Sequence, residues 1–295
     1  MGDFSAAWLA LREPADTRAR RAALVGRLTD WLVRTRPPRL EVLDLGCGSG
    51  ANLRYLAPRL AARLGVRQDW ICVDRDPELL AALQRELEPS APRDWQVRTL
   101  RLDLARGVPA LPIAPGTLTV ASALLDLVSE PWLRALLQTG AAAHSPMLLT
   151  LSYDGRATLK PQHPLDGIAI ALANAHQLRD KGLGPALGPM APIRLAELAA
   201  GLGYSVTLRR SDWKLQPGER AIQAALVEGW SAAALEQIGG TATVRWTAAI
   251  AGWREARLAL IEHGHSRMRV GHRDALLLPR PDQVRSGCAE AKSRA

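Results

Sequence analysis

The segment EVLDLGCGSGANL, residues 41–53, restricts the fold more than any other part of the sequence. Its apolar run Val42–Leu45 is predicted to be a buried parallel strand, because helices cover both faces of such a strand. Gly46, Gly48 and Gly50 follow at alternate positions, and glycine lets the backbone turn sharply and approach a ligand closely because it has no Cβ. The spacing differs from the G-x-G-x-x-G of dinucleotide-binding proteins, and no Lys-Ser/Thr follows as in a phosphate-binding loop.

Strands and helices are then predicted to alternate. Helix Asn52–Leu64 starts after the glycines, and the free amides of a helix start can bind an anion. Residues 69–76 (DWICVDRD) form a second strand, with Pro77 in the first turn of helix 77–87. Asp74 lies near the position, about twenty residues after a glycine turn, where an acid binds ribose hydroxyls in such folds. Asp76 fits the N-cap of the helix better.

Three more strands complete this half of the chain. They are residues 96–104, ending in Asp103-Leu104, residues 116–128 (GTLTVASALLDLV), which run into a loop, and residues 146–152 (PMLLTLS). Strand-helix alternation of this kind predicts a doubly wound α/β sheet.

In these features the sequence resembles the class I S-adenosylmethionine (SAM)-dependent methyltransferases. VLDLGCGSG is similar to their first motif and GTLTVASALLDLV to their fourth, which lines the methyl-transfer site. The resemblance implies a mostly parallel, seven-stranded Rossmann-like sheet, SAM as cofactor, no metal, and an Asp103 that binds the adenine amino group. The residues predicted to bind the cofactor are Asp44, Gly46, Cys47, Gly48, Gly50, Asn52, Asp74, Arg75, Asp103, Leu104, Ser122 and Leu125.

The resemblance also divides the chain. We expect an N-terminal helical cap over residues 1–38, a methyltransferase domain over 39–279 and a disordered tail over 280–295. The family's last elements are matched to helix 193–202, strand 205–212 and an antiparallel strand 271–278, and residues 153–192 and 213–265 are insertions. The second insertion carries helical patterns near 218–235 and 244–263. Because ligands of open α/β sheets bind at the carboxyl ends of the strands, both insertions are predicted to cover the cofactor cleft as a substrate lid.

Candidate substrate residues follow from this placement. Asn174, Gln177 and Lys181 gather at one helix end in the first insertion, where a solvent-exposed helix end is an equally good explanation. Arg267 and Arg269 lie where the chain re-enters the sheet, and guanidinium groups suit an anionic acceptor. Their predicted neighbours are His265, His272, Arg273, Arg209 and Arg210, and surface charge competes as an explanation for each. His176 and Asp126 are the candidate general bases, needed only if the acceptor is protonated.

Composition leaves the acceptor open. With 295 residues and 47% hydrophobic content the chain can bury a large core, and no segment approaches the roughly 18 apolar residues of a membrane span. The three cysteines form no framework, so we expect a reducing, cytoplasmic location. We favour a small anionic metabolite as acceptor. The net charge of +9 keeps RNA open as an alternative acceptor. The arginines of LREPADTRAR (residues 11–20) could reach the cofactor carboxylate or the substrate, but a solvent-exposed helix surface is favoured for them. A non-catalytic scaffold is disfavoured by the intact glycine turn.

Overall fold

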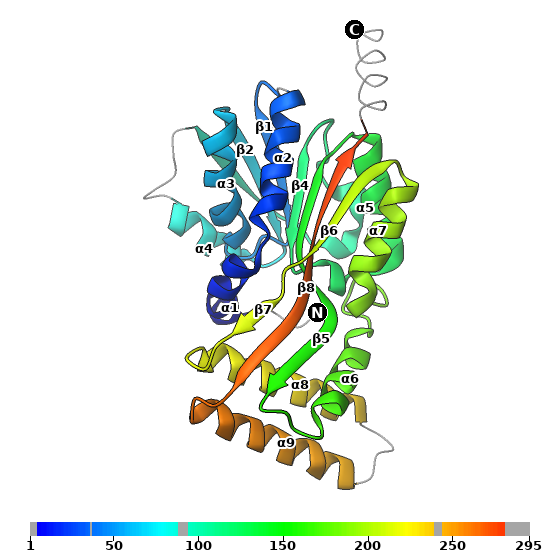
Figure 1. Ribbon diagram of the computed structural model, residues 1–295. Coiled ribbons are helices and arrows are strands. Elements are labelled where there is room, and N and C mark those ends of the chain that lie inside the picture. The colour runs from blue at the N-terminus through cyan, green and yellow to red at the C-terminus, as the bar shows by residue number, and fades with distance from the viewer. Residues whose placement is uncertain (1–4, 36, 88–93, 239–243, 281–295) are drawn as a thin grey trace.

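The computed structural model describes residues 5–35, 37–87, 94–238 and 244–280. A twisted mixed sheet forms the middle of three layers (Figure 1). The strands are β1 (Leu40–Leu45), β2 (Gln68–Asp74), β3 (Trp95–Arg101), β4 (Leu118–Ser122), β5 (Met147–Lys160), β6 (Tyr204–Arg210), β7 (Trp213–Leu215) and β8 (Arg267–Pro279). Their order is β3-β2-β1-β4-β5-β8-β6, with β7 also paired to β8. Strands β1 to β5 pair in parallel and β8 is antiparallel to β5 and β6, which confirms the predicted fold.

Helices cover both faces of the sheet. They are α1 (Ala6–Ala19), α2 (Ala22–Thr35), α3 (Ala51–Leu64), α4 (Pro77–Leu87), α5 (Glu130–Ala142), α6 (Asp166–Gln177), α7 (Ala191–Gly201), α8 (Arg220–Ile238) and α9 (Val244–Glu262). Helices α2, α3 and α4 pack on one face and α5 and α7 on the other. No helix in the described ranges is long and apolar enough to cross a membrane.

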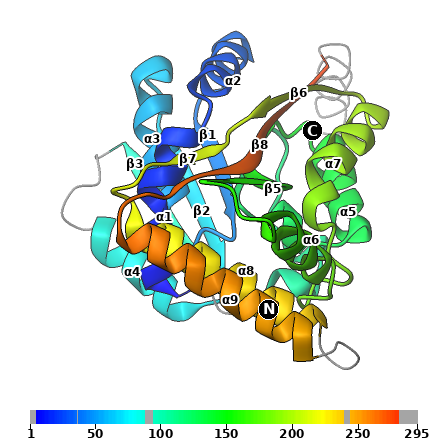
Figure 2. The same ribbon diagram turned by 60° about the horizontal axis from the view of Figure 1, so that its bottom comes forward.

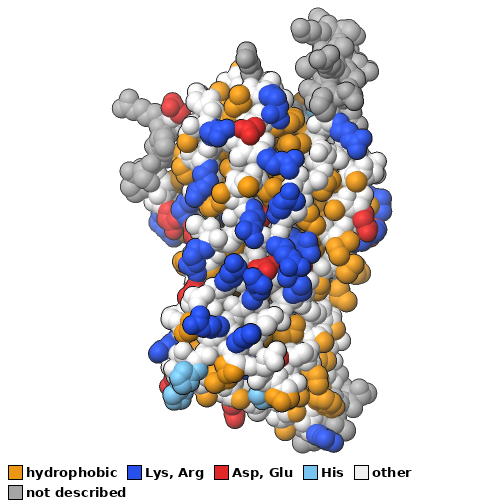
Figure 3. Space-filling model, in the orientation of Figure 1, with side chains coloured by type: hydrophobic (Ala, Val, Ile, Leu, Met, Phe, Trp, Pro, Cys, Tyr) orange, Lys and Arg blue, Asp and Glu red, His pale blue; other side chains and the backbone are white. Residues whose placement is uncertain are grey.

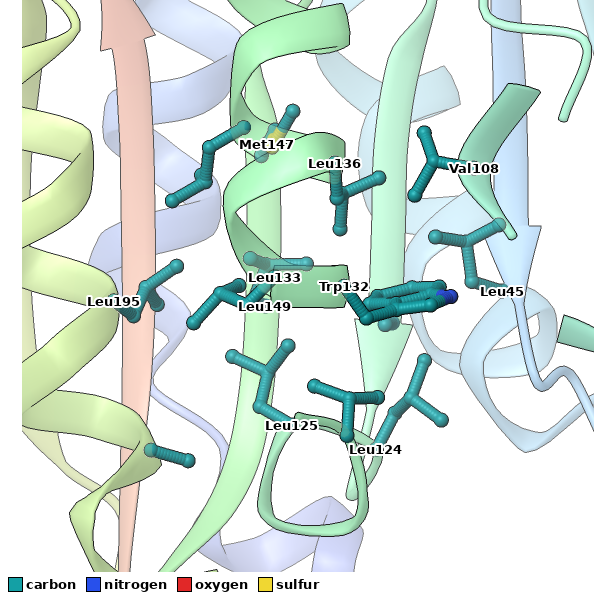
Figure 4. Packing of buried hydrophobic residues seen from close by; sticks show 14 of the residues in the cluster. Leu45, Val108, Leu124, Leu125, Trp132, Leu133, Leu136, Met147, Leu149 and Leu195 are labelled. Atoms are coloured by element: carbon teal, nitrogen blue, oxygen red, sulfur yellow. The ribbon is translucent and has the colours of Figure 1, made fainter. Parts of the chain in front are cut away.

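Apolar residues at helical spacing explain this packing. Leu24, Leu28 and Leu32 recur every four residues along α2 and are buried against the sheet. On the opposite face α5 packs beside β4 and β5 (Figure 4). The indole N–H of Trp132 on this helix donates to the backbone oxygen of Leu104 at 2.9 Å. These contacts hold the carboxyl ends of the central strands in place.

The sheet continues further than the sequence predicts. Strand β5 does not end near Ser152 but runs to Lys160, and β8 begins at Arg267 instead of Gly271. Each extension supplies the backbone partners of the other, with Lys160 opposite Arg267, and β7 adds a third strand. The first predicted insertion therefore starts as a strand. We call the three-stranded part beyond Ser152 the ribbon.

The remaining helices pack on one face of the ribbon. Figures 1 and 2 show α6, α8 and α9 gathered at the end of the molecule where β5 ends and β8 starts. A separate core, which includes Trp213, Trp230 and Trp253, lies between these helices, α1 and the ribbon. Arg257 of α9 is fully buried and its Nε donates to Asp166 of α6 at 2.9 Å. Whether these helices and the ribbon act as a substrate lid stays a prediction. The tail predicted to be disordered falls, from residue 281 on, outside the described residues.

Candidate active site

A pocket lies at the carboxyl ends of β1, β2 and β4, where α1 covers the glycine turn. Its lining comes from five segments of the sequence. They are α1 with its C-cap (Leu9, Arg12, Asp16, Arg20), the glycine turn with the start of α3 (Gly46–Ser49, Ala51, Asn52), the end of β2 with the start of α4 (Asp74–Asp76, Leu79), the residues after β3 (Leu102–Leu104) and the end of β4 with the loop after it (Ser122–Leu124, Leu127).

The glycine turn is held to the end of β2. Gly46 and Gly48 have φ angles of 63° and 54°, in the left-handed region that disfavours side chains. The carboxylate of Asp74 accepts from the amide of Gly48 at 2.8 Å and from the amide of Asp76 at 3.0 Å. Each oxygen keeps a further lone pair, so the same carboxylate can accept from hydroxyl groups of a ligand.

Two other acids at this end cap helices. Asp76 accepts from the amide of Glu78 at 2.8 Å, which agrees with its predicted N-cap role. Asp103 accepts from the amide of Ala105 at 3.0 Å, so its side chain starts the short 3-10 turn after β3. Both carboxylates also line the pocket.

A buried polar chain connects α1 to the glycine turn. Arg20, which is 7% exposed, donates to Asn52 Oδ1 at 2.7 Å and to Ser122 Oγ at 3.1 Å. Asn52 in turn donates to Asp44 at 2.8 Å, and the guanidinium lies 4.7 Å from the ring centre of Tyr55. Burial lowers the pKa of Arg20 and raises the pKa of Asp44 to about 7. Two buried atoms in this chain, Arg20 Nε and Asp44 Oδ2, have no hydrogen-bond partner.

A second polar chain joins α1 to the ribbon. Arg12 donates to Asp16 through Nε at 2.9 Å and through a terminal nitrogen at 3.2 Å. The indole N–H of Trp213 donates to the same carboxylate at 2.9 Å. His272 packs on Trp213 with ring centres 4.7 Å apart, and burial lowers its pKa to about 3.

Nine of the twelve predicted cofactor residues line this pocket: Gly46, Cys47, Gly48, Asn52, Asp74, Arg75, Asp103, Leu104 and Ser122. Asp44 lies behind Asn52, Gly50 is the N-cap of α3, and Leu125 belongs to the hydrophobic core, as Figure 4 shows. Their roles toward a cofactor stay predictions.

The sequence favours a solvent-exposed position for the α1 arginines over contact with the ligands. The structure places Arg12 and Arg20 in the pocket lining together with Asp16. Arg12 and Asp16 are four residues apart and share one face of α1, and Arg20, four residues further on, is the C-cap of the helix. That spacing was the available signal for their position.

The predicted substrate and base residues lie outside the pocket lining. Asn174 and His176 both lie on α6. Asn174 accepts a hydrogen bond from the hydroxyl of Tyr153 at 2.9 Å, and His176 is hydrogen-bonded to Glu236 at 2.7 Å. Desolvation raises the pKa of Asp126, a half-buried residue whose buried Oδ1 has no hydrogen-bond partner.

The predicted arginine cluster does assemble, but not in the pocket lining. Arg267 donates to Gln216 at 2.8 Å and Arg269 lies 3.5 Å from Asp212. Gln177 Oε1, like Asp126 Oδ1, is buried without a hydrogen-bond partner. The positive charge of Lys181 acts to lower the pKa of Asp126. A substrate role for these residues stays a prediction.

Comparison with known proteins agrees with this architecture. Residues 42–146 match the family described as "Methyltransferase domain". No curated protein matches the chain. Solved structures that are similar to the chain include the following three. The cyclopropane synthase MmaA2 from Mycobacterium tuberculosis has 14% identity and a TM-score of 0.41, covering 84% of this chain and 83% of its own. The magnesium protoporphyrin IX methyltransferase from Synechocystis PCC 6803 has 18% identity and a TM-score of 0.42, and the match covers 72% of this chain and 83% of that protein. The YcgJ protein from Bacillus subtilis has 12% identity and a TM-score of 0.47, and the match covers 88% of this chain and 100% of that protein.

The family match covers the glycine turn and the strands β1 to β4 whose ends line the pocket. The sheet order and the antiparallel β8 complete the family's fold. The chain therefore carries a class I SAM-dependent methyltransferase domain.

Proposed function

We propose that the domain transfers the methyl group of SAM to a small anionic acceptor, a carboxylate in its simplest form, bound between α1 and the loop after β4. One observation carries the proposal. Arg12 of α1 lines the pocket together with Ser122 and Leu124, the segment that resembles the family's methyl-transfer motif. Guanidinium groups in a largely buried site favour a ligand with negative charge.

The residues of the pocket fit SAM. Asp74 can accept from ribose hydroxyls and Asp103, with the amide of Leu104, can bind the adenine. Arg20 lines the other end of the pocket, and its buried Nε has no hydrogen-bond partner. This guanidinium can donate to the carboxylate of SAM.

SAM supplies a methyl group made electrophilic by its sulfonium, so the protein's task is to bind, orient and desolvate the acceptor. Leu9, Leu124 and Leu127 give the pocket apolar walls that exclude water. Arg12 is held rigidly by Asp16, and its remaining N–H groups can bind an anion.

The pocket also favours an acceptor that needs no base. No histidine lines it among the described residues, and His176 and Asp126 lie outside the lining. Asp16 is already engaged by Arg12 and Trp213. A carboxylate is deprotonated at neutral pH and can attack without a general base.

The experiment incubates the protein with methyl-labelled SAM and a metabolite extract separated by charge. We expect label in the anionic fraction. Arg12→Gln should raise the KM for the labelled acceptor by about 10- to 100-fold, because a hydrogen bond to a charged group contributes about 1.5–3 kcal/mol. The affinity for SAM, measured by calorimetry, should stay unchanged.

Arg18→Gln is the matched control, since Arg18 lies on the same helix but is 56% exposed and pairs with Glu219. Arg18→Gln should change neither the KM for the acceptor nor the affinity for SAM. Label found only in neutral or cationic molecules, or only in RNA, contradicts the proposal. Label in no fraction, together with normal SAM binding, would favour a scaffold.

A further inference from the structure

The outward face of the ribbon carries only polar and basic side chains over the three strands β5, β8 and β7. Cross-strand partners lie on the same face of a sheet, and Lys160 pairs with Arg267, Lys214 with Arg269, and Arg210 of β6 with Arg273. Arg156 joins them, because it lies across Gly271, where an added Cβ would be 2.9 Å from its own Cβ. We call this set of seven cations the basic ribbon face.

The opposite face of the same strands is core. Leu159, Leu215, Met268 and Val270 alternate with the cations and are buried against α8, α9 and α1. The period of two along a strand therefore sends every cation to the same side. Figure 3 shows Lys and Arg side chains spread over this side of the molecule, where Figure 1 places β6, β7 and β8.

Few acids balance this charge. Asp154 and Asp212 are the carboxylates that contact the basic ribbon face, and both bind Arg156. Lys160, Lys214, Arg210 and Arg267 make no ion pair with any residue in the described ranges. Their charges are thus available to a partner.

This surface is separate from the methyl-transfer pocket. None of its seven cations lines the pocket. A groove runs beside it toward α6, lined by Arg156, Thr158, Gln162, Asn174 and Arg269. The anion that the face suits is therefore a different ligand from the proposed acceptor.

The geometry points to one kind of partner: we propose that the basic ribbon face binds the sugar-phosphate backbone of a nucleic-acid duplex, without reading its sequence. Cations two residues apart on a strand are spaced about 6.8 Å, and adjacent strands about 4.8 Å. The resulting lattice of fixed positive charges extends over about 20 Å of β8, from Arg267 to Arg273. A regularly charged polymer can engage several of them at once, and arginine forks bind phosphate oxygens in pairs.

The makeup of the face argues against other anionic partners. A single strand is bound through stacking on aromatic side chains, and no Trp, Tyr, Phe or His belongs to the outward positions of the ribbon. Binding to a membrane or to a protein relies in part on apolar side chains at the contact surface. The exposed large hydrophobic residues are elsewhere, at Val33, Ile168, Leu178, Met190, Ile193 and Trp246.

The test measures binding of fluorescent duplex RNA and duplex DNA by anisotropy between 50 and 200 mM salt. We expect a dissociation constant of roughly 1–100 µM, as for non-specific binding, and a linear fall of log K with log salt. The triple variant K160Q/K214Q/R267Q removes three unpaired cations. Its salt slope should be smaller by about 3, since each lost phosphate contact contributes about 0.9.

The matched control is R34Q/R98Q/R245Q, which changes the net charge equally at three exposed cations on α2, β3 and α9. It should keep the wild-type slope. Both variants should keep the thermal stabilisation by SAM, which shows that they fold. The proposal is overturned if the salt slope falls equally in both variants, or if no duplex binds at 50 mM salt. It is also overturned if phosphatidylserine vesicles displace the duplex at a lower concentration than single strands do. Methyl transfer into the duplex would overturn the small-acceptor proposal and leave this one standing.

Discussion

Alanine at Gly48 tests whether α1 closes on the glycine turn as the structure shows. The substitution has two separate costs. Gly48 has a φ of 54°, and an L-residue in that conformation costs about 1–2 kcal/mol. An added Cβ would also lie 2.9 Å from Cδ1 of Leu9 on α1, and crowding in a packed site costs typically about 1–3 kcal/mol. We therefore expect Gly48→Ala to lower the free energy of unfolding by about 2–5 kcal/mol.

Two further variants separate these costs. Gly65, at the C-cap of α3, has a φ of 60° with no atom within 4 Å of an added Cβ, so Gly65→Ala should show the backbone cost alone. Leu9→Ala removes the crowded methyl group, so the double variant with Gly48→Ala should be less destabilised than the two single effects predict. The difference should be about 1–3 kcal/mol.

Urea denaturation with an unchanged m-value measures these free energies. Gly48→Ala that costs no more than Gly65→Ala, or strict additivity with Leu9→Ala, would show that Leu9 does not rest on the glycine turn in solution.

Two more predictions concern the site and its surroundings. Asp74→Ala should weaken SAM binding by about 1–3 kcal/mol, because ribose hydroxyls and the Gly48 amide lose their acceptor; calorimetry that finds unchanged affinity contradicts the assignment. The pKa of His272 is lowered from 6.5 to about 3 by burial and by nearby Arg12, so the folded state binds fewer protons than the unfolded state between these values. Stability from the neutral ring is complete above pH 6.5 and falls by about 1.4 kcal/mol per pH unit below it. His272→Phe should remove this slope, and urea denaturation at pH 5 and pH 7 that shows the same pH dependence in both proteins refutes the argument.

Much of the cofactor end follows from short stretches of sequence. The apolar run before Gly46, the alternate glycines and Asp103 each depend on neighbours a few residues away, whereas Asp74 also binds the amide of Gly48 from the neighbouring strand. Backbone sterics and strand burial act over that range, so these features can be predicted from the local sequence. The sheet order follows from the family resemblance of these stretches, and the structure confirms it.

The acceptor end depends on contacts that sequence patterns do not express. Arg12 and Arg20 face the pocket because Asp16 receives the indole N–H of Trp213, nearly two hundred residues away, and that bond turns the polar face of α1 inward. From its sequence alone a charged helix is predicted to be exposed to solvent, because charged side chains are rarely buried.

The arginine cluster on β8 shows the same limit. Its sequence position at the carboxyl edge of the sheet predicts a cleft, but β5 and β8 continue past that edge and pair with each other as the ribbon. Side chains alternate along a strand, so the pairing buried Met268 and Val270 in the core and left Arg267 and Arg269 on the outer face. Sequence alone determined which residues alternate; only the tertiary structure decided which of the two faces met the core, because that choice depends on α1, α8 and α9 packing there.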